Sequence, residues 1–373
     1  MRKTNGRGPV LVVAGARPNF MKVVPILHEL DRRGISRLFV HTGQHYDVKM
    51  SEALLADLKA PAPDVLLEVG SASHAVQTAR VMERFEPVLL EHRPGWVVVV
   101  GDVNSTLACA LVASKLREEI GCRIAHVEAG LRSHDWRMPE EVNRVLTDRL
   151  SDLLLTPSED VGPTLEREGL TAIRAELVGN VMIDSLLAVL PRARELCTPE
   201  RLRVKAGTYV LATLHRPSNV DEPARLELLL RALALIAKSH TVVFPMHPRT
   251  RQRAEAAGLE SLLECLVVTE PLGYAEMVGM MDGAIAVVTD SGGLQEETTV
   301  LGVPCVTVRE QTERPITVLQ GTNRMVQWPP TIDGIVGDLR AAIYSGRLAV
   351  GSRSPSGWDG HAAERIVSAL LRE

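Results

Sequence analysis

Short apolar segments recur along the chain and alternate with longer segments of amphipathic, helical character. Most of the apolar segments are continuous rather than alternating, which is typical of parallel strands covered on both faces. Repeated alternation of strand and helix predicts an α/β protein. A final amphipathic helix is expected over His361–Arg372. The expected strands are Val10–Ala14, Leu38–His41, Trp96–Val100, Ile124–Val127, Leu153–Thr156, Tyr209–Leu214, Thr241–Phe244, Leu266–Val268, Ala284–Thr289 and Cys305–Val308.

The length of the chain predicts two domains. A chain of 373 residues exceeds what one hydrophobic core usually supports. Residues 190–207 are polar and contain two prolines, so we expect a boundary between residues 180 and 205. The predicted halves are a Rossmann-like domain over residues 1–180 and a Rossmann-like, nucleotide-binding domain over residues 181–357. The terminal helix, residues 358–373, is expected to pack back onto the N-terminal domain.

Composition narrows the class of partner. Apolar residues make up 45% and charged residues 24% of the chain, and the net charge is −4, so nothing favours nucleic acid or an anionic membrane as partner. The five cysteines are scattered without a C-x-x-C pair, which favours a reducing cytoplasm without disulfides or structural zinc. No apolar run approaches the roughly 18 residues of a membrane span. We therefore expect a cytoplasmic protein with a small-molecule substrate.

Residues 284–308 have the pattern of a strand, a glycine-rich turn, a helix and a second strand. Gly302 and Pro304 end the predicted helix. At its beginning, free N–H groups and the helix dipole favour a phosphate group. Two carboxylates, Glu296 and Glu297, follow within the helix and suit the hydroxyl groups of a ribose. The segment predicts a nucleotide site, and the phosphate-binding residues would be Ser291, Gly292 and Gly293.

The first strand ends in the segment GARPNFMK, residues 15–22. Pro18 suits the first turn of a helix, which places Arg17 and Lys22 near a helix N-terminus, where they could contact a polyphosphate. A strand–helix corner with solvated cations is the simpler interpretation of these two residues alone. The chain has neither G-x-G-x-x-G after this strand nor a P-loop, so tight NAD binding and P-loop ATP hydrolysis are not expected.

Three carboxylates follow strands or begin helices in the N-terminal half. Asp102 follows a buried strand, Glu128 follows the next one, and Glu140 lies in the first turn of a predicted helix. If those strands are neighbours, the three meet at one sheet edge, where clustered carboxylates suit proton abstraction from carbon. Asp102 could instead cap the helix that follows it. A metal site is a rival interpretation, which the sparse spacing disfavours.

Two histidines end consecutive strands of the C-terminal half. His215 lies in LHRPSN and His247 in MHPR. Histidines at strand ends are often structural, but a histidine beside an arginine at two successive strand ends suggests contact with an anion. His41 and His45 flank Gly43 and do not share a helix face, so they do not form a zinc ligand pair.

Together these segments resemble the non-hydrolysing UDP-N-acetylglucosamine 2-epimerase family. The resemblance extends from Val10 to Arg324 and rests on GARPNFMK, HTGQHYD, GDVNST, HVEAGLRS, MPEEVNR, LHRPSN, DSGGLQEE and TERP, in that order. It implies two Rossmann-like doubly wound domains facing a central cleft, the glycosyltransferase-B architecture. The implied activity interconverts UDP-N-acetylglucosamine (UDP-GlcNAc) and UDP-N-acetylmannosamine (UDP-ManNAc) through 2-acetamidoglucal, without NAD, another cofactor or a metal, in a homodimer.

The resemblance also implies roles for individual residues. Asp102, Glu128 and Glu140 would be the acid/base carboxylates, and His215 would neutralise charge on the departing diphosphate. The remaining substrate-binding residues would be Arg17, Lys22, His247, Ser291, Gly292, Gly293, Glu297 for the ribose and Arg314 for the pyrophosphate. The segment with Gln44 and His45 matches the region where bacterial members bind a second, activating UDP-sugar.

Two departures from the family pattern leave alternatives open. Val103 stands where many members carry threonine, and the loop between Arg132 and Pro139 is shorter than in many bacterial members. The alternatives are an epimerase of another UDP-2-acetamido sugar, a glycosyltransferase, an enzyme releasing free N-acetylmannosamine, or an inactive UDP-sugar sensor. The four residues Asp102, Glu128, Glu140 and His215 argue against the sensor.

Overall fold

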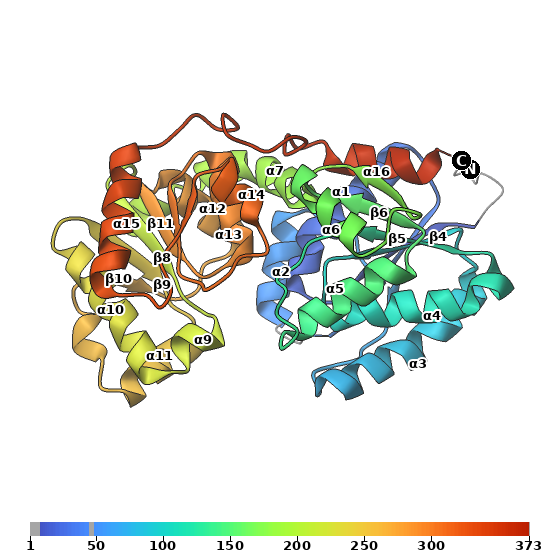
Figure 1. Cartoon of the computed structure of the whole chain (residues 1–373), viewed down its shortest axis with the longest axis horizontal. Coiled ribbons are helices and arrows are strands. Elements are labelled where there is room, and N and C mark those ends of the chain that lie inside the picture. Colours follow the sequence, from blue (N-terminus) through green and yellow to red (C-terminus); the bar gives the residue numbers. More distant parts are fainter. Residues whose placement is uncertain (1–7, 45–47, 373) are drawn as a thin grey trace. The chain divides into compact units, whose positions relative to one another are not determined.

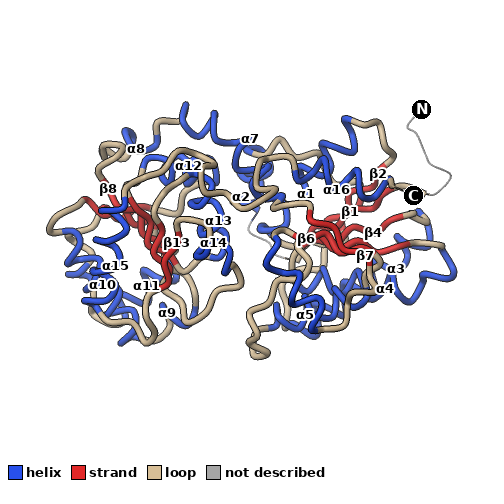
Figure 2. The backbone as a smooth tube through the Cα atoms, turned by 45° about the horizontal axis from the view of Figure 1, so that its top comes forward, coloured by secondary structure: helices blue, strands red, loops and turns tan. Residues whose placement is uncertain are grey.

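The computed structural model describes residues 8–44 and 48–372, which form two compact units (Figure 1). Unit 1 extends to Ala188 and includes Ser356–Glu373, and unit 2 is Val189–Pro355. Each unit has a parallel sheet with helices on both faces (Figure 2). The prediction of two Rossmann-like, doubly wound α/β parts is confirmed.

Unit 1 contains a seven-stranded sheet with the order β3-β2-β1-β4-β5-β6-β7. Its strands are β1 (Val10–Ala14), β2 (Arg37–His41), β3 (Val65–Leu66), β4 (Trp96–Val100), β5 (Arg123–Val127), β6 (Leu153–Thr156) and β7 (Arg174–Leu177). Its helices are α1 (Arg17–Arg32), α2 (Val48–Asp57), α3 (His74–His92), α4 (Asn104–Ile120), α5 (Pro139–Leu150), η1 (Glu159–Val161), α6 (Gly162–Arg167) and α16 (Ala362–Leu371), and α7 (Val181–Glu195) continues into unit 2.

Unit 2 contains a six-stranded sheet with the order β10-β9-β8-β11-β12-β13. Its strands are β8 (Tyr209–Thr213), β9 (Thr241–Pro245), β10 (Val267–Thr269), β11 (Ala286–Thr289), β12 (Cys305–Thr307) and β13 (Asn323–Met325). Its helices are α8 (Thr198–Arg201), α9 (Pro217–Val220), α10 (Pro223–Ala237), α11 (Pro248–Ala256), η2 (Glu260–Leu262), α12 (Tyr274–Gly283), α13 (Gly292–Leu301), α14 (Pro315–Leu319) and α15 (Ile332–Ser345).

The strand order of each sheet reverses at one point. In unit 1 the reversal lies between β1 and β4, and in unit 2 between β8 and β11. Ligands of open α/β sheets bind outside the carboxyl ends of the strands at such a point. The segments that follow β1, β4, β8 and β11 therefore occupy the positions where each unit is built to bind a ligand.

All ten expected strands are present, and three further strands occur. The three, β3, β7 and β13, each form an edge of a sheet. Their side chains are only partly buried; β7, for example, alternates between half-buried and exposed residues. Without burial on both faces they lack the continuous apolar run that marks the central strands.

The polar segment expected to separate the domains is largely helical. Helix α7 runs through Pro191 to Glu195, and the two units divide within this helix, between Ala188 and Val189. The boundaries at residues 180 and 357 stay a prediction as limits of independently folding domains. No helix in residues 8–44 and 48–372 has both the length and the apolar character needed to cross a membrane.

The terminal helix α16 is fastened to unit 1 by polar contacts. Its N-cap residue, His361, provides no side-chain capping bond. Asp184 of α7 supplies the cap instead, accepting hydrogen bonds from the backbone N–H groups of Ala362 at 3.1 Å and Ala363 at 2.8 Å. At the other end of the helix, the indole of Trp96 donates to the Leu370 carbonyl at 3.0 Å.

Replacing Asp184 with Ala is expected to lower the free energy of unfolding by about 1–2 kcal/mol, because two buried N–H groups at a helix N-terminus lose their acceptor. The measurement is urea denaturation followed by circular dichroism. Burial raises the pKa of Asp184 to about 6, against the opposing effect of the two backbone hydrogen bonds. An unchanged midpoint for Asp184→Ala at pH 8 would show that water replaces the cap at no cost.

Candidate active site

The turn after β1 is held by Asn19. The side-chain oxygen of Asn19 accepts hydrogen bonds from the backbone N–H groups of Gly15 and Ala16, both at 3.0 Å, and its amide donates to the Val100 carbonyl at 3.3 Å. The turn is thereby tied to the end of β4. Pro18 lies in the first turn of α1, as expected.

Lys22 is directed from α1 toward the ends of β4 and β5. Its ammonium group forms an ion pair with Glu128, and both side chains are more than 90% buried. A Cβ added to Gly101 would lie 3.1 Å from Lys22 Nζ, so the ammonium group also lies against the turn that carries Asp102. Lys22 and Glu128, expected from the sequence to contribute to the site, are thus direct partners.

Asp102 is held by helix α5. Arg144 pairs with its carboxylate, and the side-chain amide of Asn143 donates to the Asp102 carbonyl at 2.9 Å. The N-cap of α4 is Val103, and it makes no side-chain capping bond. The alternative that Asp102 caps this helix is therefore wrong. The carboxylate keeps 28% of its surface exposed, so it is open to a ligand.

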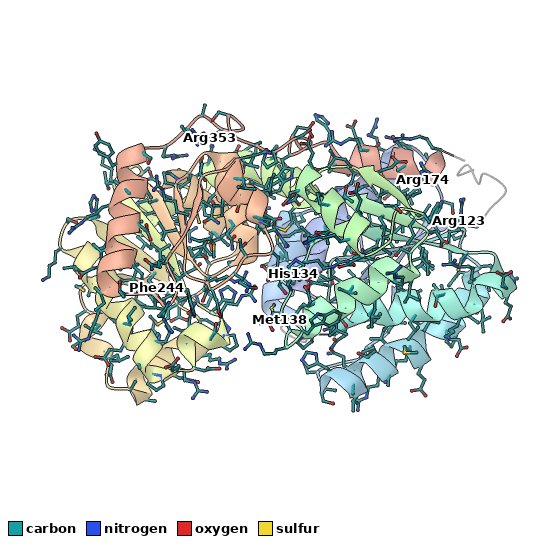
Figure 3. All side chains as sticks on the ribbon, viewed as in Figure 1. Arg123, His134, Met138, Arg174, Phe244 and Arg353 are labelled. Atoms are coloured by element: carbon teal, nitrogen blue, oxygen red, sulfur yellow. The ribbon has the colours of Figure 1, made fainter. Side chains whose placement is uncertain are left out.

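The loop between β5 and α5, in which Figure 3 labels His134 and Met138, is organised by Glu141. This buried carboxylate accepts from the backbone N–H groups of Ser133 at 2.8 Å and His134 at 2.9 Å, and from Arg144 at 2.9 Å. Arg144 therefore bridges Glu141 and Asp102. The neighbouring Glu140, half-buried in the first turn of α5, has no ion-pair partner among the described residues.

The segment after β2 lies beside the same turns. Gln44 is buried, and its side-chain oxygen accepts from the Ser105 hydroxyl at 2.8 Å, at the beginning of α4. Its proposed part in an activator site is untested. His45 lies outside the described residues, and of Arg17 only its position as the first residue of α1 is described.

In unit 2, His215 and Asp290 form a pair across neighbouring strands. His215 Nδ1 lies 2.9 Å from Asp290 Oδ1, and Asp290 is fully buried while 52% of the His215 side chain is exposed. Burial opposes ionisation of Asp290, but the hydrogen bond and charge of His215, with bonds from Arg216 N–H and the Asn219 amide, lower its pKa. A buried carboxylate therefore orients the His215 ring.

The N-terminus of α13 is open. Ser291 is the N-cap residue, but its side chain makes no capping hydrogen bond. Ser291, Gly292 and Gly293 are half-buried, and a Cβ on Gly292 would have no neighbour closer than 4.0 Å. A hydroxyl and the first N–H groups of a ten-residue helix are thus available to an anion, as expected for phosphate.

The two carboxylates of α13 have different partners. Glu297 accepts a hydrogen bond from the Tyr274 hydroxyl at 2.9 Å. Burial raises the pKa of Glu297 to about 7, the Tyr274 hydrogen bond opposes this rise, and the charge of Glu296 adds to it. Glu296 lies 2.6 Å from Arg314 Nε in an ion pair that is almost fully buried. In this structure, the Arg314 guanidinium therefore neutralises Glu296.

His247 is exposed and serves as the N-cap of α11, accepting from the backbone N–H of Arg249 at 3.2 Å.

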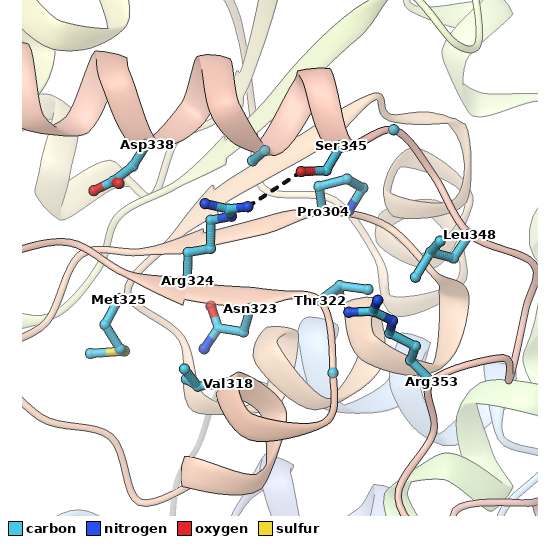
Figure 4. Close-up of a pocket in the computed structure, with 13 residues that line it drawn as sticks. Pro304, Val318, Thr322, Asn323, Arg324, Met325, Asp338, Ser345, Leu348 and Arg353 are labelled. Carbon is cyan, nitrogen blue, oxygen red and sulfur yellow. Dashed lines mark hydrogen bonds between the residues drawn. The ribbon is translucent and has the colours of Figure 1, made fainter.

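Unit 2 also has a cavity of about 610 Å³ between β13 and α15 (Figure 4). Arg353 lines it, as does Arg324, which donates to the Ser345 hydroxyl at 3.3 Å. Pro304, just before β12, also borders it, so it lies toward the amino ends of these strands. None of the expected site residues lines this cavity.

The family model described as UDP-N-acetylglucosamine 2-epimerase matches residues 28–371. The chain belongs to this family. The resemblance expected from the sequence motifs is thus confirmed. The family is one of UDP-2-acetamido sugar 2-epimerases, and the glycosyltransferase-B type of fold expected from the sequence is confirmed as well.

Two curated relatives and one solved structure illustrate the similarity. The chain is 37% identical over 370 residues to a UDP-N-acetylglucosamine 2-epimerase of Methanococcus maripaludis, covering 97% of this chain and 98% of the relative. It is 43% identical over 321 residues to a UDP-2,3-diacetamido-2,3-dideoxy-D-glucuronate 2-epimerase of Pseudomonas aeruginosa, covering 85% and 88%. The Methanocaldococcus jannaschii UDP-GlcNAc 2-epimerase, in complex with UDP-GlcNAc and UDP, matches with a TM-score of 0.85 and 36% identity over 98% of this chain and 100% of that one.

Several polar residues of this epimerase are not identified by the sequence pattern. Glu141, Arg144 and Asp148 are buried on one face of α5, at the spacing i, i+3, i+7. Leu146, on the other face, is 44% exposed. An amphipathic helix normally buries its apolar face. The inverted pattern is a signal that could have pointed to α5 as a wall of the site.

Proposed function

We propose that this chain is a UDP-GlcNAc 2-epimerase that interconverts UDP-GlcNAc and UDP-ManNAc. The observation that carries the proposal is the arrangement in unit 1. Asp102 and Glu128 follow adjacent parallel strands, each beside a buried cation, and Glu140 begins the helix that binds Asp102. Unit 2 supports the proposal with an open helix N-terminus for phosphate and with His215.

The reaction consists of an elimination and its reversal. One carboxylate removes the proton from C2, the C1–O bond to the diphosphate breaks, and UDP leaves with the bonding electron pair. The products held by the enzyme are 2-acetamidoglucal and UDP. UDP then re-adds at C1 while a proton is delivered to the opposite face of C2, so no oxidant, reductant or cofactor is consumed.

The proposed roles combine those implied by the family resemblance with the contacts of the described residues. Asp102, Glu128 and Glu140 exchange the C2 proton, and Lys22, with Arg17, favours binding of the negatively charged substrate. Ser291 with the N–H groups of Gly292 and Gly293 binds the diphosphate, as does Arg314. Glu297 accepts from the ribose hydroxyls. His247 contributes a second histidine near the phosphates, and Gln44 with His45 marks the proposed activator region.

The testing experiment is proton NMR of the purified protein with UDP-GlcNAc in D₂O. We expect deuterium to enter C2 as UDP-ManNAc accumulates. Formation of UDP-ManNAc without deuterium at C2 would contradict the elimination mechanism, and release of free N-acetylmannosamine would assign a hydrolytic activity. No change in UDP-GlcNAc would contradict the proposed substrate.

A second candidate substrate has support from one relative. The similarity to the P. aeruginosa enzyme, named for a diacetamido glucuronate, is as high as that to the UDP-GlcNAc epimerases. The same NMR assay with UDP-2,3-diacetamido-2,3-dideoxy-D-glucuronate distinguishes the two. A kcat/KM that is higher for the glucuronate than for UDP-GlcNAc would establish the alternative.

We also propose a homodimer in the cytoplasm. Helix α5 turns Leu146 outward, and Val142 lies with Ala79 and Met82 of α3 along an open groove of about 460 Å³ in unit 1. Apolar side chains gathered on an outer face are typical of an interface. Light scattering that gives the mass of one chain would contradict the dimer.

Uridine binding is expected to strengthen as the pH rises from 5.5 to 8, on the order of tenfold if ribose hydroxyls donate to an ionised Glu297. The direction of the pH effect on binding follows from the raised pKa of Glu297, about 7. In the free protein, ionisation of Glu297 lowers the stability of the fold as the pH rises from 4.5 through 7. Because the bound hydroxyls favour the ionised carboxylate, binding strengthens over the same pH range. Titration calorimetry in buffers of different ionisation enthalpy should record proton release near pH 6.5. Uridine has no phosphate to titrate, and Glu297→Gln should abolish the pH dependence.

A further inference from the structure

A fully buried charged cluster lies beneath the proposed acid/base residues in unit 1. His126 of β5 and Asp148 of α5 have no exposed surface, and His126 Nδ1 lies 2.6 Å from Asp148 Oδ1. Arg132 places Nη2 2.7 Å from Asp148 Oδ2 and also binds Glu168. The remaining residues of β5 between Ile124 and Val127 are buried and apolar. An apolar side chain at position 126 would therefore suit the packing of this strand as well as His126 does.

The His126 ring is held at both of its nitrogen atoms. The second ring nitrogen of His126, Nε2, lies 2.8 Å from the carbonyl oxygen of Gly101. Both partners of the ring, a carboxylate and a carbonyl, are hydrogen-bond acceptors. Burial opposes ionisation of Asp148, but the charges and hydrogen bonds of His126 and Arg132 hold its pKa below the ordinary value. Arg132 therefore lies between two carboxylates, those of Asp148 and Glu168.

His126 and Asp148 each contact a segment that carries one of the proposed catalytic carboxylates. His126 holds the carbonyl of Gly101, the residue immediately before Asp102. Asp148 Oδ2 accepts from the backbone N–H of Gly130 at 3.1 Å, two residues after Glu128. Asp148 itself lies on α5, eight residues or about 12 Å along the helix from Glu140.

The Glu128 turn needs such an anchor because its backbone is strained. Glu128 has a φ of 72°, a left-handed conformation that is uncommon for a residue other than glycine. Gly101 and Gly130 also have positive φ values of 64° and 86°. Strained residues persist only where the surrounding structure holds them. The hydrogen bonds to Gly101 and Gly130 are contacts that hold these turns.

We infer that His126, Asp148 and Arg132 form a positioning unit that sets the relative placement of the Asp102 turn, the Glu128 turn and helix α5. The inference rests on the proposed function, because it assigns these residues to the acid/base step. They do not contact substrate. They act by keeping three carboxylates, which come from different parts of the chain, in the geometry that proton transfer at C2 requires.

The test compares Asp148→Asn with Asp184→Asn, the same change at a half-buried carboxylate that caps α16 in the same unit. An amide at position 148 cannot accept from His126, Gly130 and Arg132 together. At a temperature where both variants are folded by circular dichroism, Asp148→Asn should lower kcat about 100-fold, because small misplacements of reacting groups have effects of this size. KM and the Kd of UDP should stay within about threefold of the parent values, and Asp184→Asn should keep the parent kcat.

Hydrogen exchange measured by mass spectrometry provides a readout that does not depend on substrate. In Asp148→Asn, exchange should accelerate in residues 101–106 and 128–133, whereas in Asp184→Asn it should accelerate near α16. Two substitutions of His126 separate the contacts and are milder if Asp148→Asn does not fold. His126→Gln should retain the bond to Gly101, and His126→Asn should lose it, with faster exchange confined to residues 101–106.

Equal kcat values in Asp148→Asn and Asp184→Asn would overturn the inference, as would unchanged exchange in both catalytic segments. If the parent protein converts no UDP-GlcNAc, the proposed substrate fails. The exchange experiment still decides whether the cluster holds the two turns, because it needs no turnover.

Discussion

Asp102→Asn is expected to reduce the interconversion of UDP-GlcNAc and UDP-ManNAc by about a thousandfold, and Glu140→Gln by a similar factor. General acid/base groups contribute about 10² to 10⁴ in rate, and an amide can neither accept nor deliver the C2 proton. Deuterium incorporation at C2 should fall in parallel with turnover. In contrast, the Kd of UDP should hardly change, because the proposed phosphate and ribose contacts belong to unit 2.

The two substitutions differ in their structural consequences. Asp102 pairs with Arg144, so Asp102→Asn also removes half of an ion pair, although Arg144 retains Glu141. Glu140 has no ion-pair partner among the described residues, so Glu140→Gln should leave the melting temperature unchanged. A suitable control is Asp135→Asn in the same loop, since within the described part of the chain the Asp135 carboxylate binds only Arg137. Loss of UDP binding in Asp102→Asn would reassign Asp102 to a structural role.

His215→Ala is expected to lower kcat by about 10²- to 10³-fold, the range found when a donor to a developing negative charge is removed. The physical reason is the position of the ring. Asp290 fixes Nδ1, and 52% of the side chain remains exposed for contact with a diphosphate. Since the charge on the leaving group grows only as the C1–O bond breaks, KM should change much less than kcat.

The measurement is turnover together with scrambling of an ¹⁸O label from the bridging position of the sugar diphosphate, which reports C1–O cleavage directly. Both should slow in His215→Ala. His240, just before the amino end of β9, provides the control. Among the described residues its side chain hydrogen-bonds only to Ser239, and it lies at the amino edge of the sheet, away from His215. A rise in KM with unchanged kcat would mean that His215 binds the substrate equally in the ground state and the transition state.

The polar contacts suggest a division of work between the carboxylates. Asp102 and Glu128 each lie beside a buried cation, Arg144 and Lys22 respectively. Glu140, half-buried in the first turn of α5, has no such partner among the described residues. A carboxylate without a fixed countercharge breaks no ion pair when it takes part in proton transfer. We therefore expect Glu140→Gln to change the pH dependence of kcat as well as its magnitude.

The sequence alone determined the central part of each sheet and the places in the fold of most of the proposed site residues. Buried parallel strands such as β4 and β5 are continuous apolar runs, and the residues that follow them must lie at the carboxyl edge. For this reason Asp102, Glu128 and Ser291 were located correctly in the fold without coordinates. The edge strands β3, β7 and β13 were not, because strands that are only partly buried carry no such run.

Only the tertiary structure decided which groups are partners. Arg144 binds Asp102, which lies 42 residues earlier in the chain. Lys22, on the helix that follows β1, pairs with Glu128, which follows β5. It also excluded Asp102 as a helix cap and showed α5 with its polar side buried. A sequence pattern shows the hydrophobic period of a helix or strand and which of its faces is buried. Which side chains pair across long stretches of the chain depends instead on how the strands are ordered in the sheet. The positioning of the proposed acid/base residues is therefore a property of the fold, even though each residue is visible in the sequence.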